Sequence, residues 1–97
     1  MRDTRRLTDR LGDIQQRLAH GLPRIDPHHR LLGRPVSYQV IDGRAFEITY
    51  RDVAGIAEAE IDGVKRLIGE ECFCVVAPQT AESVIVRFVV PLKSPEV

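Results

Sequence analysis

The 97-residue sequence has no tryptophan, one methionine and only two cysteines. No apolar run approaches the ~20 residues that a membrane-spanning helix needs. The N-terminal segment MRDTRRLTDR is charged and lacks the apolar stretch of a signal peptide. Cys72 and Cys74 are too close together to close a useful disulfide loop, so they are not a disulfide framework. These absences predict a cytoplasmic protein in a reducing compartment.

Motifs for catalysis and cofactor binding are also missing. The serines are Ser37, Ser83 and Ser94, and none lies in the context of a nucleophile elbow. The glycines are scattered, so no phosphate-binding loop can be recognised. Glu58 and Asp62 are spaced as neighbours on an exposed helix face, where solvation explains them. We therefore expect a protein that is not an enzyme and binds no cofactor.

Residue types that bind zinc are present, but their spacing argues against a metal site. His28 and His29 are adjacent, and adjacent histidines rarely both point at one metal ion. Cys72 and Cys74 have one intervening residue, whereas zinc knuckles prefer two. We expect no metal site, and interpret these residues as a polar loop and two small strand residues.

The composition, 43% hydrophobic and 29% charged, is that of an ordinary globular protein of one domain spanning residues 1–97. The net charge is zero, but it is unevenly divided. Residues 1–34 hold eight arginines against four aspartates, and residues 35–97 carry the opposite excess. A basic arm on an acidic body can dock on nucleic acid, on an acidic partner or on a second copy of the chain.

The segment from Asp52 to Gly69 has the periodicity of an amphipathic helix. Its apolar side holds Val53, Ile56, Ala57, Ile61, Val64, Leu67 and Ile68. Only Glu60 falls on the wrong side. Because strand-like segments flank it, we expect this helix to cover a sheet.

A first helix is predicted from Thr4 to His20, ended by Gly21 with Pro23 just beyond. Its apolar residues form a narrow seam, typical of helix pairing, rather than the wide stripe of a core helix. The seam consists of Leu7, Leu11, Ile14 and Leu18. It is too short for a stable free coiled coil, so it must pack on the body or on a partner helix. We divide the chain into a helix (1–22), a connector (23–35), a core (36–91) and a flexible tail (92–97).

Two hairpins are expected on either side of the central helix. In the first, residues 36–50, a three-residue loop Ile41-Asp42-Gly43 places both apolar sets on one face and pairs Tyr38 with Phe46 and Val36 with Ile48. The second joins strands 72–77 and 84–90 through a longer loop, Pro78–Ser83. Ile85 and Val89 fall on the face away from the core, so something should cover them.

The order helix, hairpin, helix, hairpin predicts an α+β fold with a four-stranded antiparallel sheet. An alternative remains, because Ile-Asp-Gly recurs at 41–43 and 61–63 and AEAEI alternates like a strand. Residues 36–90 would then form a small all-β barrel or meander behind an N-terminal helix. Two glycines inside the central helix, at ~1 kcal/mol each, favour that alternative.

The sequence best supports a non-catalytic protein–protein interaction or assembly module that self-associates or docks a partner through its N-terminal helix, with no membrane contact. The residues predicted to bind the partner are Leu7, Leu11, Ile14, Leu18, Ile85 and Val89. The alternative is a nucleic-acid-binding accessory protein. The arginines predicted to contact phosphates are Arg5, Arg6, Arg10 and Arg17.

Overall fold

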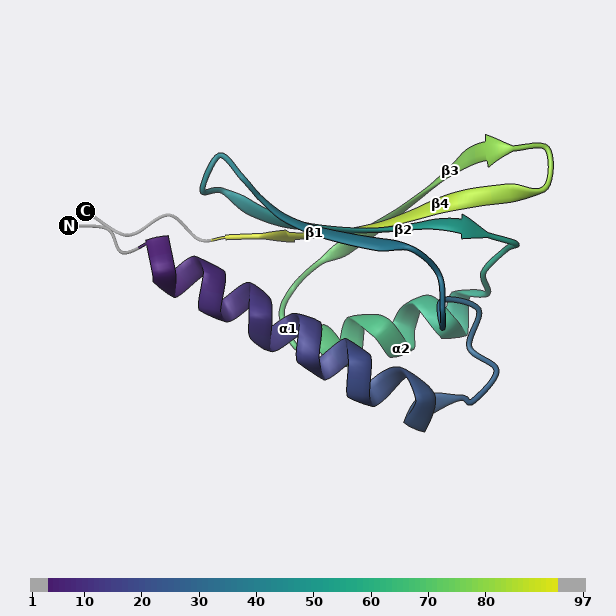
Figure 1. The fold of residues 1–97 in the computed structure, drawn as a ribbon, viewed down its shortest axis with the longest axis horizontal. Helices are drawn as coiled ribbons and strands as arrows, with labels where there is room; N and C mark the ends of the chain where they lie inside the picture. Colours follow the sequence, from purple (N-terminus) through teal and green to yellow (C-terminus); the bar gives the residue numbers. More distant parts are fainter. Residues whose placement is uncertain (1–3, 93–97) are drawn as a thin grey trace.

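A computed structural model describes residues 4–92, without the side chains of residues 4 and 5. The secondary-structure elements are α1 (Thr4–Ile25), β1 (Val36–Ile41), β2 (Ala45–Val53), α2 (Glu58–Ile68), β3 (Phe73–Thr80) and β4 (Ser83–Pro91). The four strands form one antiparallel sheet in the order β1-β2-β4-β3. Both helices lie on the same face of this sheet (Figure 1). The predicted α+β fold is confirmed, and the all-β alternative is wrong because residues 58–68 are helical.

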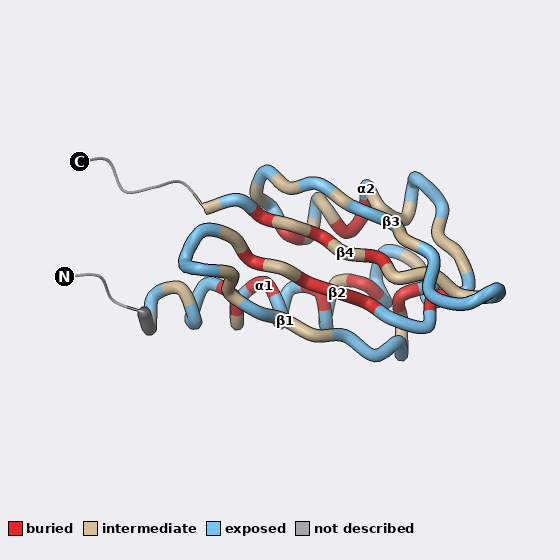
Figure 2. Tube along the Cα trace, turned by 90° about the horizontal axis from the view of Figure 1, so that it is seen from above, coloured by how far each residue is buried: buried red, intermediate tan, exposed pale blue. Residues whose placement is uncertain are grey.

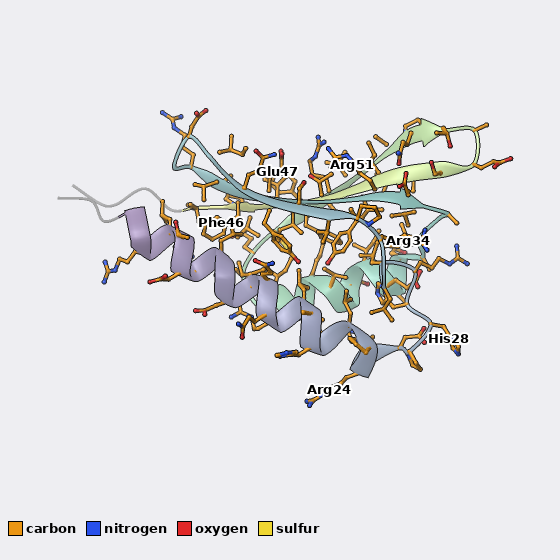
Figure 3. The ribbon with its side chains drawn as sticks, in the orientation of Figure 1. Arg24, His28, Arg34, Phe46, Glu47 and Arg51 are labelled. Carbon is orange, nitrogen blue, oxygen red and sulfur yellow. The ribbon has the colours of Figure 1, made fainter. Side chains whose placement is uncertain are left out.

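The core lies between the sheet and the two helices. Phe46 and Phe88, on the central strands β2 and β4, are fully buried, and Phe46 points toward the helices in Figure 3. Tyr50 meets Phe88 edge to face, with ring centroids 6.4 Å apart. Viewed onto the sheet, buried and partly buried positions alternate along β2 and β4, as expected for strands with one covered face (Figure 2).

Helix α1 runs five residues past its predicted end and passes through both residues interpreted as a stop signal. A Cβ atom at Gly21 would overlap a methyl group of Leu67, so the glycine allows α1 to approach α2 closely. Pro23 lies inside the last helical turns. Close packing of the two helices therefore explains Gly21 better than chain termination does.

The leucine seam of α1 packs on the chain's own body. Ile14 and Leu18 have 0% exposed surface, Leu11 and Leu22 are also buried, and Leu7 is partly buried against the same cluster. The sequence allows this seam to pack either on the body of the chain or on a partner helix, and the structure shows the first.

The first hairpin has the predicted loop length but a different register. Val40 pairs with Phe46 and Tyr38 with Ile48, and the loop is residues 42–44. Asp42 and Gly43 both have positive φ, and the Arg44 N–H donates to the Ile41 carbonyl over 2.8 Å. Because Asp tolerates the left-handed region, the turn can begin one residue later and keep Ile41 in the ladder. The shift is an even number of residues, so the apolar sets still share one face.

Helix α2 begins at Glu58, six residues later than predicted, because β2 continues to Val53. Asp52 has a φ of 60° at a register shift in β2, and Gly55 has a φ of 155°, so the chain cannot be helical there. Glu60, the residue out of phase with the apolar face, reaches back and accepts a hydrogen bond from the Ala57 N–H over 2.9 Å. It therefore caps the first turn of the helix.

The second hairpin is tighter than predicted. β3 and β4 extend to Thr80 and Ser83 and leave a two-residue turn, where the Thr80 and Ser83 hydroxyls share a hydrogen bond of 2.8 Å. Pro78, assigned to a loop from sequence, is part of β3. Of the predicted tail, Leu92 is held by a hydrogen bond from its N–H to the Arg44 carbonyl, and residues 93–97 lie outside the described residues.

Replacement of a seam residue tests the place of α1 in the core. Leu18→Ala should lower the free energy of unfolding by about 2–4 kcal/mol, because it leaves a cavity beneath the sheet. Gln16→Ala, on the exposed side of the same helix, should change it by less than about 0.5 kcal/mol. Urea titration followed by circular dichroism measures both. Equal, small effects would show that α1 does not contribute to the core.

The cap at Glu60 gives a pH-dependent test. Partial burial by itself raises the pKa of this carboxyl, but hydrogen bonds from the Ala57 and Arg30 amides and the charge of Arg30 bring the pKa below its usual 4.5. The stabilisation is therefore present above pH 4.5 and lost as the pH falls through the lower pKa of the folded state. Glu60→Gln should cost about 1 kcal/mol at neutral pH.

That difference between Glu60→Gln and the parent protein should shrink in acid. Urea titrations of both proteins at neutral pH and at about pH 3 measure it. A difference that stays constant across this range would contradict the proposed role of the carboxylate charge.

Candidate interaction surface

The face of the sheet opposite the helices is covered by no element within residues 4–92 (Figure 1). Its two halves differ in character. The half over β1 and β2 is polar, and Glu47 and Arg51 point away from the helices there (Figure 3). The half over β3 and β4 is apolar apart from Arg87, and we call its apolar part the outer apolar patch. The patch consists of Phe73, Val75, Ala77, Ile85 and Val89.

Strand β3 carries three of the five large hydrophobic side chains that are exposed among the described residues. Phe73 is 51% exposed, Val75 47% and Val76 45%, and the only other large hydrophobic side chains exposed among the described residues are Ile25 and Val36. In Figure 2 β3 is drawn almost entirely in the colours of exposed and intermediate residues, unlike β2 and β4. Scattered apolar residues are normal on a surface, but a contiguous group is typical of an interaction site.

The charged group nearest the patch is directed away from it. Arg87 lies between Thr49 of β2 and Val75 of β3 in the pairing register. Its Nε donates to the Thr49 hydroxyl over 3.3 Å and lies 3.9 Å from a carboxylate oxygen of Glu47. Both contacts draw the guanidinium toward β2. Arg87 therefore lies within this half of the face but is turned toward the polar half over β1 and β2.

The predicted partner-binding residues fall into two groups. Ile85 and Val89 belong to the outer apolar patch and are partly buried beside β3. Leu11, Ile14 and Leu18 are core residues, so contact between them and a partner would require α1 to leave the sheet. The structure thus brings Ile85 and Val89 together with Phe73 and Val75, which the sequence analysis did not select. The signal was available: FCVV is an uncharged run in a strand next to Ile85 and Val89.

Two of the four arginines predicted to contact phosphates make contacts within the chain. Arg17 donates from Nε to the Leu67 carbonyl over 3.0 Å and from Nη2 to the Ile68 carbonyl over 2.7 Å. These carbonyls are at the C-terminus of α2, where a cation is favourable. Arg17 therefore fastens α1 to the end of α2.

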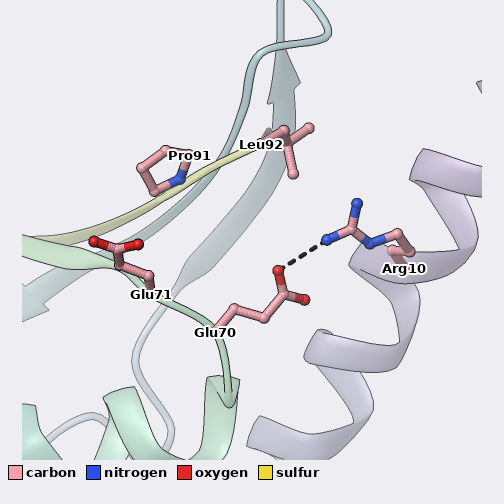
Figure 4. A pocket seen from close by; sticks show the side chains of 5 residues that line it. All are labelled: Arg10, Glu70, Glu71, Pro91 and Leu92. Atoms are coloured by element: carbon pink, nitrogen blue, oxygen red, sulfur yellow. Dashed lines mark hydrogen bonds and ion pairs between the residues drawn. The ribbon is translucent and has the colours of Figure 1, made fainter. Parts of the chain in front are cut away.

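Arg10 is the second arginine engaged inside the chain. It forms an ion pair of 2.8 Å with Glu70 (Figure 4). Its guanidinium also lies 5.4 Å from the centre of the Phe46 ring. Arg6 is exposed, and the side chain of Arg5 lies outside the described residues. Nucleic-acid binding by these residues stays a prediction, with fewer unengaged arginines than the sequence suggested.

The histidines and cysteines lie apart. His29 is buried and is held by the Leu31 N–H at Nδ1 and the Glu60 carbonyl at Nε2, whereas His28 is exposed. Burial raises the pKa of both thiols, Cys72 and Cys74, which keeps them protonated and poorly reactive. Within residues 4–92, no group of three or more His, Cys, Asp or Glu side chains is placed to hold a metal ion.

The two cavities beside the sheet gather no catalytic groups. One, of about 500 Å³, lies between the start of α1 and the end of the sheet and is lined by Arg10, Glu70, Glu71, Pro91 and Leu92 (Figure 4). Its arginine and Glu70 are already paired with each other. A second, of about 300 Å³, lies between α1 and β1, where burial raises the pKa of Tyr38 beside Tyr50. Neither holds a nucleophile next to a base.

Comparison with protein-family models, curated proteins and solved structures found no match to this chain. No described helix is long and apolar enough to cross a membrane.

The contacts of Arg17 make a further prediction about stability. Arg17→Ala should lower the free energy of unfolding by about 1 kcal/mol, since it removes two hydrogen bonds that are partly screened by solvent. Arg6→Ala, on the same helix and exposed, serves as the matched control and should have no measurable effect. Thermal unfolding of the two variants distinguishes them. Equal midpoints would mean that Arg17 does not hold the helices together in solution.

Proposed function

We propose that this chain is a non-catalytic protein–protein assembly module that associates with a second copy of itself through the outer apolar patch. The observation that carries the proposal is the grouping of exposed apolar side chains on β3. Of the five large hydrophobic side chains exposed among the described residues, three lie on this one strand, and two of these, Phe73 and Val75, lie on the outer face beside Ile85 and Val89. A folded monomer gains nothing from leaving them in water, whereas a partner that covers them gains the free energy of their burial.

Self-association was also expected from sequence, but the surface proposed here is a different one. The α1 seam is occupied by the chain's own core, whereas the patch is unoccupied by any described residue. Docking through α1 therefore requires the helix to leave the sheet, and docking through the patch requires no rearrangement. This difference in conformational cost favours the patch.

The exposed portions of a few side chains make a small interface. A stable interface buries ~800 Å² on each partner, and the patch offers considerably less. We therefore expect an association that depends on concentration, with monomer and dimer exchanging in the micromolar range.

A charge introduced into the patch tests the proposal. Phe73→Asp should shift the protein from a dimer, of about twice 10.9 kDa, to the monomer, because the carboxylate would be desolvated in the interface. Phe73 is half exposed, so the monomer should keep its fold. Light scattering coupled to size-exclusion chromatography at several concentrations measures the mass.

The matched control is Ser37→Asp, which adds the same charge to the same sheet face on the far strand β1, near Arg51. It should leave the dimer intact. A parent protein that remains monomeric at every concentration, or an equal loss of mass in both variants, would overturn the proposal.

A further inference from the structure

The exposed apolar side chains of β3 lie on both faces of the sheet. Phe73 and Val75 point to the outer face, whereas Val76 points to the helix side, opposite Val86 of β4. Val86 is fully buried, but Val76 is 45% exposed, so the helices do not cover the sheet as far as its edge. A partner lying flat on the outer face would leave Val76 in water. A strand added beside β3 would cover apolar side chains on both faces.

Of the usual protections against such pairing, the edge of β3 has a proline, Pro78, but no charged side chain. In the described chain β3 pairs with β4 alone. Edge strands of monomeric proteins are commonly guarded by charged side chains, and β3, FCVVAPQT, has none. This is also what self-pairing requires, because a two-fold axis would bring any charge on the strand close to its own copy.

Pro78 determines which backbone groups face the open edge. It is aligned with Val84 in the β3–β4 ladder, and proline has no N–H to give to that ladder. The pair must therefore be a non-hydrogen-bonded one, with the Pro78 nitrogen directed away from β4. The register is regular from Phe73 to Pro78, so the N–H and C=O groups of Cys74 and Val76 also face the open edge.

We propose that β3 pairs antiparallel with β3 of a second copy about a two-fold axis at Val75, which joins the two sheets into one. This rests on the proposed self-association and specifies that the contact runs along the β3 edge of the outer apolar patch, with Ile85 and Val89 of β4 outside it. In this register, Cys74 of each copy lies opposite Val76 of the other, and the two residues exchange backbone hydrogen bonds. Every edge-facing amide between Phe73 and Ala77 is therefore used. An axis at Val76 would place Pro78 opposite Cys74 and lose a donor. An axis at Cys74 would extend beyond Phe73, where β3 begins.

Side-chain sizes agree with this register. Phe73 lies opposite Ala77 of the second copy, on the outer face, so a large side chain covers a small one twice by symmetry. Val75 meets Val75 of the second copy between them. On the helix side, Val76 lies beside Cys74 of the second copy and loses part of its exposure. One arrangement thus gives all three exposed side chains of β3 an apolar neighbour in the second copy.

A cysteine scan tests the register. In the Cys72→Ser, Cys74→Ser background, Val75→Cys places two thiols at a non-hydrogen-bonded pair with Cα atoms ~4.5 Å apart, within the range that a disulfide spans. Mild oxidation at a concentration where the dimer forms should cross-link this variant at least tenfold faster than Val36→Cys, on the opposite edge strand. Non-reducing electrophoresis measures the rate. Equal rates, or faster cross-linking of Val76→Cys or of native Cys74, would overturn the proposed axis.

A proline substitution tests the backbone bonds independently of cysteine. Val76→Pro should keep the folded monomer, because its nitrogen faces the edge as that of Pro78 does, but it removes two symmetry-related donors from the dimer. The dimer dissociation constant should rise more than tenfold. Val76→Thr, which keeps the N–H and the side-chain shape, is the control and should change it far less.

The results also separate this inference from the self-association on which it rests. A parent dimer that Phe73→Asp disrupts but Val76→Pro does not would leave the self-association standing and overturn strand pairing, in favour of face-to-face packing of sheets. A monomeric parent protein overturns both. Open aggregates in place of a closed dimer would also overturn the two-fold arrangement.

Discussion

Burial of one sheet face under two helices is the constraint on which the rest of this structure depends. Helix α1 contributes Ile14 and Leu18 to the core, and α2 contributes Val64 and Ile68. The helices can share one sheet face because Gly21 lets Leu67 approach the backbone of α1. With both helices on one side, the other face is left without a cover from the described chain.

Polar contacts around the helix ends hold this arrangement. Arg17 binds the last carbonyls of α2, and Glu60 binds the amides of Ala57 and Arg30 at its start. Each of these charged side chains satisfies backbone groups that a helix leaves unpaired. Residues that look like surface charges in the sequence therefore connect α1, the connector and α2. Their use inside the chain leaves the apolar sheet edge as the better-supported interaction surface.

On the outer face of the sheet, the polar side chains pair with one another, whereas the apolar side chains of β3 are left exposed. Arg87, Thr49 and Glu47 contact one another across β2 and β4. β3 has no equivalent network, and its exposed residues lie on both sides of the sheet. A strand edge with free amides and apolar side chains on each face suits a partner strand better than a flat surface. The proposed function as an assembly module rests on that property rather than on any pocket.

The order of helices and strands could be predicted from sequence because periodicity is a local property. Apolar spacing at 7, 11, 14 and 18 predicts a helix wherever it packs, and alternation at 84, 86, 88 and 90 predicts a strand with one buried face. The outward direction of Ile85 and Val89 followed from the same alternation. The register predicted for the first hairpin was wrong by two residues. Because this is an even number, the apolar side chains were still assigned to the correct face of the sheet.

Tertiary packing decided what local patterns could not. In the sequence, Gly21 could either end a helix or allow a close contact between helices. Only the position of Leu67 in the structure distinguishes the two roles. The central helix does not begin at Asp52, as its apolar pattern predicts, because β2 bulges there, which depends on pairing with β4. The exposure of Phe73, Val75 and Val76 depends on β3 lying at the edge of the sheet, a consequence of strand order. The sequence alone determined which residues alternate, and contacts between distant segments decided which of them are covered, since burial is a property of neighbours in space.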